Sequence, residues 1–292
     1  MVYLKVIKNG GRNKMAKKIL LYLITLSMLM FSSIVSAKSI RIGTEGAYPP
    51  WNNINAAGEL EGAEIDFGNE ACKRMNVDCE WVTQDWDGII PALLNGKYDI
   101  IIAGMSITEE RKQKVNFTNG YMNDGARFFV LKDSGLADIS IAGVTKVNMN
   151  TAGGKENAAV GQMIAAFTGK NICVQSSTTH ANLATEYMSG NSNVKLYQTV
   201  DDHNIDLAAG RCDTVLSDVA SAIDFMATDQ GSNAAFTGPT FSGGPWGDGV
   251  GGAIRKEDTD ILEMWNKAIA EMSADGTTAK ITEKWFGRDM SM

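Results

Sequence analysis

The 292-residue chain has little of what several protein classes depend on. Four cysteines are too few for a disulfide-stapled miniprotein of this length, and a hydrophobic content of 44% is too high for a disordered chain. Its 27 basic residues are outnumbered by 34 acidic ones, and the resulting net charge of −7 argues against nucleic acid as a partner. With these classes excluded, a globular protein remains, and its length allows one large or two ordinary domains.

Residues that commonly catalyse reactions or bind metals are also scarce. The chain has two histidines, His180 and His203, and contains neither a G-x-S-x-G nor an H-E-x-x-H motif. No cluster of side chains has metal-ligand spacing. Gly153-Gly154 is not followed by G-K-[ST], and the glycine-rich stretch 247–252 precedes a predicted strand, whereas a dinucleotide fingerprint follows one. We therefore expect no catalytic residue, no metal and no cofactor.

Basic charge is concentrated at the start of the chain, where the first 37 residues hold six basic residues and no acidic one. This basic segment, an apolar run over 19–35 and the small residues before Lys38 predict a secretory signal peptide over 1–37. A membrane anchor is the alternative, although the run is short and contains hydroxyl residues. Removing six positive charges from −7 leaves −13 for residues 38–292, which contain no further run long enough to span a membrane.

Export would place the four cysteines in an oxidising compartment. Cys72 and Cys79 are seven residues apart, at the end of a predicted helix and the start of the next strand, so a local disulfide is expected. Cys173 and Cys212 each lie near the start of a predicted strand. They can bond only if those strands are neighbours in a sheet, so a second disulfide and two buried thiols both remain open.

Hydrophobic periodicity predicts a β-α-β-α-β order twice, which is typical of parallel sheets. The first unit has strands at 40–44, 80–83 and 99–103 and helices at 65–75 and 88–94; the second has strands at 172–175, 194–197 and 214–217, a helix opening at 178–179 and another at 202–209. Between them, residues 133–170 form a predicted insertion with a helix at 155–167. The tail adds a strand at 249–255, a helix at 259–272 and one ending near 285–286, and we expect it to pack on the first unit.

Ligands of open parallel α/β sheets bind beyond the carboxyl ends of the strands. Polar and aromatic residues gather at these positions. The candidate ligand-binding residues are Glu45, Tyr48, Trp51, Trp86, Ala103, Gly104, Ser106, Arg111, Gln175, Thr178, Thr179, His180 and Asp218. Each has an ordinary alternative, a solvated turn or helix position for the charged residues and a core position for the tryptophans. Their joint placement at strand ends favours the functional interpretation.

The chemistry of this set fits an α-amino acid. Arg111 offers a planar fork that pairs with a carboxylate, and the helix opening at Thr178-Thr179 offers N–H groups to the same anion. Asp218 would pair with an ammonium group. Glu45, together with aromatic planes, would suit a cationic side chain, because a cation gains roughly 0.5 to 2 kcal/mol over such a plane.

The chain resembles the bacterial periplasmic polar amino-acid-binding proteins of ABC transporters, the family 3 solute-binding proteins. The resemblance covers nearly all of 38–287 and runs through RIGTEGAYPPWN, LEGAEIDFGNEACKRM, DWDGIIPALLNGKYDIIIAGMSITEER, VQSSTTHANL, DLAAGRCDTVLSD and FGRD. Within the family it is similar to the lysine/arginine/ornithine, histidine and opine binders.

The resemblance implies an α/β, two-lobed type II fold, each lobe a mostly parallel sheet flanked by helices, joined by two hinge crossings. Lobe 1 would comprise 38–123 and 249–292, lobe 2 would comprise 128–242, and the hinges would lie near 124–127 and 243–248. Arg111, Ser106 and the Thr179 turn would hold the ligand carboxylate. Asp218 and Gly104 would hold its ammonium group.

Tyr48 and Trp86 would sandwich the ligand side chain, and Glu45, where the lysine/arginine/ornithine binders usually carry Asp, would pair with its distal cation. His180 stands where the family often has Gln or Ser. We therefore expect a monomeric periplasmic protein that binds a cationic L-amino acid, arginine first and then ornithine, lysine or histidine, for an inner-membrane ABC permease. Opine binding and a cyclohexadienyl-dehydratase-like enzyme are the alternatives.

Overall fold

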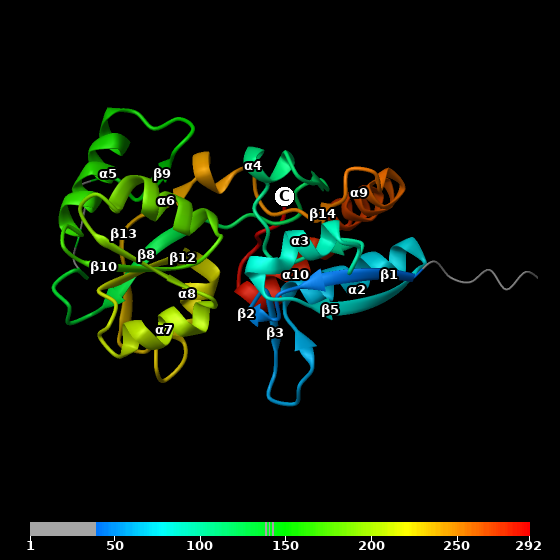
Figure 1. The fold of residues 1–292 in the computed structure, drawn as a ribbon, viewed down its shortest axis with the longest axis horizontal. Helices are drawn as coiled ribbons and strands as arrows, with labels where there is room; N and C mark the ends of the chain where they lie inside the picture. Colours follow the sequence, from blue (N-terminus) through cyan, green and yellow to red (C-terminus); the bar gives the residue numbers. More distant parts are fainter. Residues whose placement is uncertain (1–38, 138, 140, 142) are drawn as a thin grey trace, which may run out of the picture. The chain divides into compact units, whose positions relative to one another are not determined.

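The computed structural model describes residues 39–292 except 138, 140 and 142 (Figure 1). The predicted signal peptide and the alternative membrane anchor lie outside these residues. Among the residues described, no helix combines the length and the apolar character that a membrane span requires. The described elements divide into two lobes, each built on one large sheet.

Lobe 1 is built on a five-stranded sheet with a smaller three-stranded sheet beside it. Its elements are β1 (Ser39–Thr44), β2 (Ala47–Tyr48), β3 (Asn52–Ile54), β4 (Leu60–Glu61), α2 (Ala63–Met75), β5 (Asp78–Thr83), the 3-10 turn η1 (Trp86–Gly88), α3 (Ile89–Leu94), β6 (Ile100–Ile101), α4 (Glu109–Lys112), β7 (Asn116–Phe117), β14 (Ala253–Ile254), α9 (Thr259–Ala274) and α10 (Thr277–Phe286).

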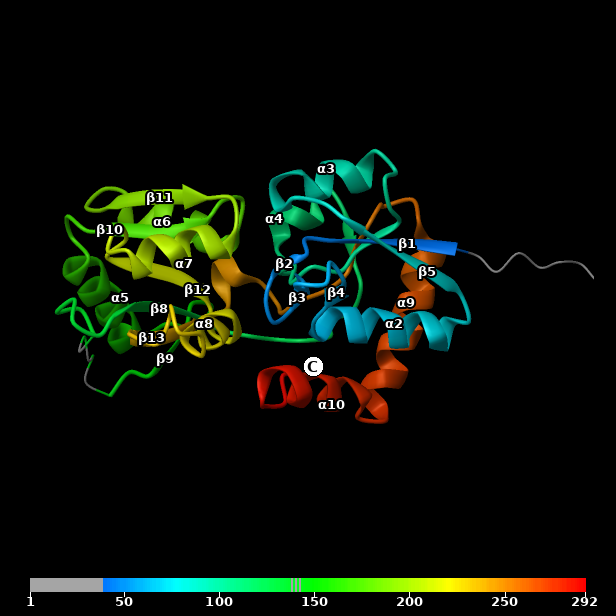
Figure 2. The ribbon, with the colours of Figure 1, turned by 90° about the horizontal axis from the view of Figure 1, so that it is seen from below.

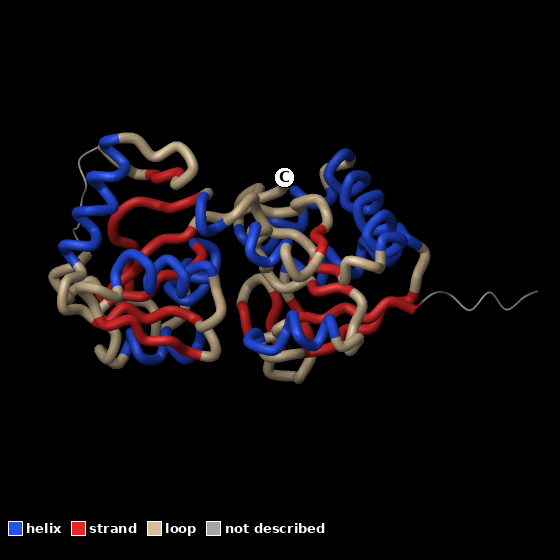
Figure 3. The backbone as a smooth tube through the Cα atoms, turned by 45° about the horizontal axis from the view of Figure 1, so that its top comes forward, coloured by secondary structure: helices blue, strands red, loops and turns tan. Residues whose placement is uncertain are grey.

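Lobe 2 is built on a six-stranded sheet flanked by four helices (Figure 3). Its elements are β8 (Ala126–Leu131), β9 (Lys146–Asn148), α5 (Gly154–Ala166), β10 (Asn171–Gln175), α6 (Thr179–Met188), β11 (Asn193–Tyr197), α7 (Val200–Ala208), β12 (Thr214–Asp218), α8 (Val219–Met226), β13 (Ala234–Ser242) and the 3-10 turn η2 (Gly244–Trp246).

The order of the lobe 1 sheet is β5-β1-β6-β14-β7, with β1 parallel to both β5 and β6. The tail returns to this lobe as predicted, because β14 enters the sheet antiparallel between β6 and β7. Helices α9 and α10 then pack against α2 (Figure 2). Since the parallel strands share one direction, β1, β5 and β6 present their carboxyl ends at one edge.

The lobe 2 sheet is mixed, with the order β11-β10-β12-β8-β13-β9. Strands β10, β11 and β12 are parallel, whereas β8, which follows the first crossing, pairs antiparallel with β12 and β13. The carboxyl ends of β10 and β12 carry Gln175 and Asp218. The repeated pattern of the sequence therefore corresponds to the parallel half of this sheet.

Two connecting segments run between the lobes and pair with each other. Met122 and Val250 form an antiparallel bridge, in which the N–H of Val250 donates to the carbonyl of Met122 at 2.8 Å. Strand β8 begins at Ala126, inside the first predicted hinge, and η2 occupies half of the second. The exact hinge bounds remain a prediction.

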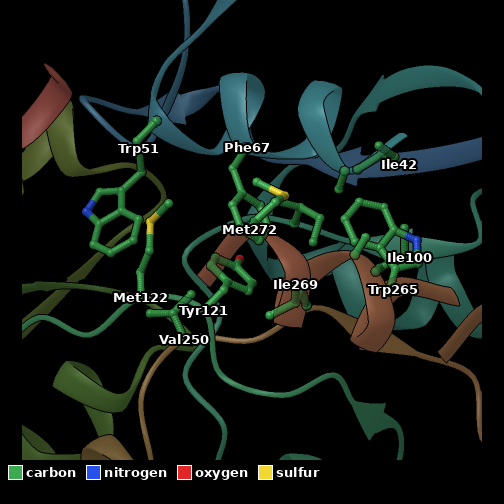
Figure 4. Packing of buried hydrophobic residues seen from close by; sticks show 14 of the residues in the cluster. Ile42, Trp51, Phe67, Ile100, Tyr121, Met122, Val250, Trp265, Ile269 and Met272 are labelled. Atoms are coloured by element: carbon green, nitrogen blue, oxygen red, sulfur yellow. The ribbon is translucent and has the colours of Figure 1, made fainter. Parts of the chain in front are cut away.

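Both lobes have buried apolar cores and each holds one disulfide. Cys72 is bonded to Cys79 in lobe 1, and Cys173 is bonded to Cys212 in lobe 2. The second bond is possible because β10 and β12 are neighbours, which brings the two Cα atoms to 6.0 Å. Figure 4 shows part of the lobe 1 core, where α2 and α9 pack their apolar side chains together.

Candidate functional site

A small cavity lies where the carboxyl ends of strands from both lobes meet. It encloses about 30 Å³, room for little more than one water. Twelve of the thirteen predicted ligand-binding residues line it. The lining residues are Glu45, Tyr48, Trp86, Ala103, Gly104, Ser106, Arg111, Gln175, Thr178, Thr179, His180, Val200, His203, Leu216, Ser217 and Asp218. An amino acid can enter only if side chains that now contact one another across this cavity separate.

Trp51 does not line this cavity, and its role as a ligand-facing aromatic stays a prediction. The side chain is 1% exposed and packs in the lobe 1 core, with its ring centroid 4.8 Å from that of Phe286. Figure 4 shows the indole beside Met122. The ring lies behind Tyr48, nearly parallel to it at 6.4 Å. The turn through Pro49-Pro50 separates the two aromatics, so that Tyr48 faces the cavity and Trp51 faces the core.

Arg111 provides a cation at one end of the cavity. It lies on the short helix α4, whose N-cap Thr108 accepts a hydrogen bond from the Arg111 N–H at 3.2 Å. Its guanidinium donates to the carbonyls of Ser106 at 3.0 Å and Ser177 at 3.4 Å, and lies 5.3 Å from the centre of the Trp86 ring. Burial lowers its pKa to about 10, so it stays charged at neutral pH. Within the described residues it forms no ion pair.

Helix α6 begins beside this cation. Thr178 is its N-cap, and the hydroxyl accepts from the N–H of Ala181 at 3.1 Å while donating to the carbonyl of Gln175 at 2.7 Å. Ser177 is held in the left-handed region at φ 56°, where its carbonyl also accepts from Trp86 Nε1 at 3.1 Å. The positive end of the helix and Arg111 therefore face the same part of the cavity, which suits a carboxylate.

Asp218 provides an anion near the middle of the cavity. It ends β12 and accepts a hydrogen bond from the hydroxyl of Tyr48, which belongs to lobe 1. Its Oδ1 lies 3.3 Å from Nε2 of His180, although the two are not aligned as a hydrogen bond. Burial and the neighbouring Asp218 raise the pKa of Tyr48 well above its usual range, so Tyr48 remains a donor. A ligand ammonium would replace Tyr48 as the partner of Asp218.

Glu45 provides a second anion at the other end of the cavity. Its side chain is 8% exposed, and Oε1 accepts from Nε2 of Gln175 in lobe 2 at 2.7 Å. Burial raises the pKa of Glu45 to about 7, and the Gln175 hydrogen bond opposes that shift. A bound cation would favour the ionised carboxylate. This group therefore adjusts its charge near neutral pH, in contrast to Arg111.

A buried carboxylate, Glu64, holds the backbone of the lining residue Gly104 in place. Both oxygens of Glu64, on α2, accept from the N–H of Gly104 at 2.8 Å, and the Tyr121 hydroxyl and Asn52 amide also donate to it. Burial raises the pKa of Glu64. Gly104 has φ 59°, and a Cβ would lie 3.1 Å from the Tyr48 ring, so glycine lets Tyr48 approach this backbone.

Four lining residues were not predicted from the sequence, and neither were the hydrogen bonds by which Glu64 holds Gly104. Leu216 and Ser217 come directly before Asp218 on β12, whereas Val200 and His203 lie on α7. The predicted start of that helix, residue 202, is two residues late. Thr199 and Asp202 form a capping box that fixes the true start, and the T-x-x-D spacing was the signal that was overlooked.

Metal binding receives no support from this geometry. Across residues 39–292, apart from the three positions not described, no group of three or more His, Cys, Asp or Glu side chains is arranged to hold an ion. The charged groups that line the cavity are one guanidinium, Arg111, and two carboxylates, Asp218 and Glu45. This pattern is complementary to a molecule with one carboxylate and two cationic groups.

Comparison with protein-family models matches residues 40–288 to "Bacterial extracellular solute-binding proteins, family 3". An L-arginine-binding protein of Pseudomonas aeruginosa is 36% identical over 94% of this chain and 98% of its own length. The octopine-binding periplasmic protein of Rhizobium meliloti is 34% identical over 87% of this chain and 92% of its own. These matches confirm the family and branch predicted from the sequence.

Solved structures agree with these relatives. An ancestral arginine-binding protein bound to arginine superposes with a TM-score of 0.71 at 33% identity, over 85% of this chain and 98% of its own. The two-lobed type II fold is therefore confirmed.

Proposed function

The chain belongs to the bacterial extracellular solute-binding proteins, family 3, and from this premise we propose that it binds a cationic L-amino acid, arginine first, between its lobes. Arg111 and the start of α6 hold the ligand carboxylate, and Asp218 holds the α-ammonium group. Trp86 and Tyr48 enclose the aliphatic stem, and Glu45 pairs with the distal cation.

The observation that carries this proposal is the charge pattern of the lining residues. Arg111 is a partly buried cation without a carboxylate partner among the described residues, and Asp218 and Glu45 are the two lining carboxylates. An arginine zwitterion matches all three charges. Glutamine would leave the buried Glu45 either protonated or unpaired, and both states cost free energy.

Opine binding is the second candidate, because an octopine-binding relative covers most of the chain. An opine carries a carboxyalkyl group on the α-nitrogen, whose carboxylate would lie beyond Asp218. The space there is lined by Asp124, Asp218 and Asp248. Asp124 pairs with Arg288 at 2.6 Å, but the lining residues in the described chain include no Lys or Arg. A second carboxylate would meet acidic neighbours, so the arginine interpretation is better supported.

The cellular context follows from the family. Family 3 proteins are extracytoplasmic and deliver solutes to ABC permeases, and the relatives found are binding proteins and not enzymes. We propose that residues 1–37 direct export and are removed, that the remaining chain is a periplasmic monomer, and that the lobes close on the ligand because it contacts both.

Isothermal calorimetry on protein recovered from the periplasm tests the proposed ligand class. Arginine, ornithine, lysine, histidine, glutamine and octopine would be titrated separately, and arginine should bind most tightly. The proposal is wrong if no cationic ligand binds more tightly than about 100 μM, near −5.5 kcal/mol. Tighter binding of octopine than of arginine would instead favour the opine candidate.

A further inference from the structure

His203 lines the ligand cavity but had no place in the predicted site. It lies on α7 and is 1% exposed, on the same helix face as the buried Val200 and Leu207. Its ring also packs edge-on against Tyr197, with 6.2 Å between centroids. Water cannot reach a ring in so enclosed a position, so each of its two nitrogens depends on the protein or a ligand for a hydrogen-bond partner.

One ring nitrogen of His203 is paired and the other is not. Nδ1 lies 3.1 Å from Oδ1 of Asn204, and because a carboxamide oxygen only accepts, Nδ1 carries the proton. Nε2 is then an acceptor with an unshared lone pair. It is fully buried and has no hydrogen-bond partner among the described residues. A buried polar atom in this state is stabilised when a donor reaches it.

The imidazole is also neutral, because burial lowers the pKa of His203 to about 3. A protonated imidazole would repel a cationic ligand, whereas a neutral one with a free lone pair attracts N–H donors. The groups of the cavity that accept hydrogen bonds therefore include a neutral nitrogen as well as the carboxylates of Glu45 and Asp218.

We propose that Nε2 of His203 accepts a hydrogen bond from the side chain of the ligand and makes this protein prefer a guanidinium to an ammonium group. The inference rests on the proposed function. A guanidinium presents five N–H donors in a fixed planar fork and can serve Glu45 and a second acceptor together. An ammonium group is a compact point charge, and one nitrogen cannot reach two acceptors on different walls as readily.

Two substitutions separate the acceptor from the packing of the ring. His203→Leu removes both nitrogens and should weaken arginine binding about 10- to 100-fold, while lysine binding falls by a smaller factor. His203→Gln places an amide near the position of Nε2 and should recover part of the arginine affinity. Calorimetry with arginine and lysine gives both ratios, and thermal unfolding without ligand checks that each variant folds.

A spectroscopic measurement on the unaltered protein covers the case in which the variants do not fold. The chain has two histidines, so nitrogen-15 labelling of histidine resolves both rings if no histidine tag is used. Nε2 of His203 should give the signal of an unprotonated nitrogen, and arginine should shift it strongly. A ring that only supports the fold would keep its signal unchanged.

The outcomes distinguish this inference from the proposed function. If the wild-type protein binds no cationic amino acid, the proposed function fails. If it binds arginine, but His203→Leu folds and keeps the wild-type preference for arginine over lysine, the inference about His203 is overturned and the proposed function stands. An unchanged Nε2 signal at saturating arginine would overturn it as well.

Discussion

The two ends of the ligand cavity hold their charges in different ways. At one end, Arg111 has a pKa of about 10, lowered by burial, and stays charged without an ion-pair partner in the described chain. At the other end, Glu45 has a pKa of about 7, raised by burial, and hydrogen-bonds to Gln175. Arg111, which would bind a group common to all amino acids, is permanently charged. Glu45, which would bind the distal group of the ligand side chain, is titratable near neutral pH.

Removing the permanent charge should have the largest effect. Arg111→Met should weaken every amino-acid ligand by about 1000-fold, since it leaves the ligand carboxylate buried and unpaired. Calorimetry with arginine, lysine and glutamine would measure the loss. Lys112→Met is the matched control on the same helix, because Lys112 is partly exposed, does not line the cavity and pairs with Glu109, and it should leave binding unchanged. A loss that differs strongly between ligands would contradict the assignment of Arg111 to the common groups.

Removing the titratable charge should change selectivity and stability together. Above the ordinary pKa of 4.5, folding penalises ionised Glu45, because its folded pKa is about 7. Glu45→Gln should therefore stabilise the ligand-free protein above about pH 7, by roughly 3 kcal/mol, and add little below about pH 4.5. Arginine affinity should fall about 100-fold and glutamine affinity should rise. Denaturant unfolding and calorimetry measure the two effects, with the exposed Glu59→Gln as control.

The pH dependence of binding should come from the side-chain end. A cationic ligand requires ionised Glu45, so arginine affinity should weaken as pH falls below about 7, at most tenfold per pH unit. Binding at about pH 5.5 should be roughly 30-fold weaker than at about pH 8. Asp124, whose pKa burial and Asp218 raise to about 7, also titrates in this range. The Glu45→Gln variant separates the contributions of the two carboxyl groups. If the pH dependence of arginine binding persists in this variant, it would be assigned to Asp124.

Trp86 contacts Arg111 and, in the proposed complex, encloses the aliphatic stem that arginine and lysine share, so a change there should weaken both ligands alike. Trp86→Phe keeps an aromatic ring but removes the Nε1 hydrogen bond to the carbonyl of Ser177 at 3.1 Å. Affinity for arginine and lysine should fall only about two- to tenfold, and their ratio should stay constant. Competition binding would measure this ratio, and a selective loss of arginine would instead place Trp86 against the distal guanidinium.

Most helices and strands could be predicted because their signals are local. The buried face of α2 and the capping of α6 by Thr178 depend on residues that are close together in sequence. Strand β14 covers only Ala253–Ile254 of the predicted 249–255, because the rest of that segment forms the crossing that pairs with Met122. Asp258 stands at the N-cap of α9, but its side chain makes no capping hydrogen bond and pairs with Arg255 instead.

The lining residues that directly follow strands could be predicted from the sequence. Those whose position depends on tertiary packing could not. Asp218 and Gln175 end their strands, so topology alone placed them together. From the sequence alone, Glu64 is an ordinary acidic residue in the first turn of a helix. Its role depends on Gly104 and Tyr121, which are 40 and 57 residues away in sequence. Trp51 follows Tyr48 by three residues, and only the fold shows that Tyr48 lines the cavity whereas Trp51 packs in the core.

The most direct test of the account compares arginine and glutamine binding to the wild-type protein and to Glu45→Gln at about pH 8, where Glu45 is mostly ionised. The two ligands share every group that Arg111 and Asp218 would bind and differ at the far end of the side chain. We predict that arginine binds more tightly to the wild-type protein and that the substitution removes or reverses this preference. An arginine preference that survives in Glu45→Gln would contradict the assignment of side-chain recognition to Glu45.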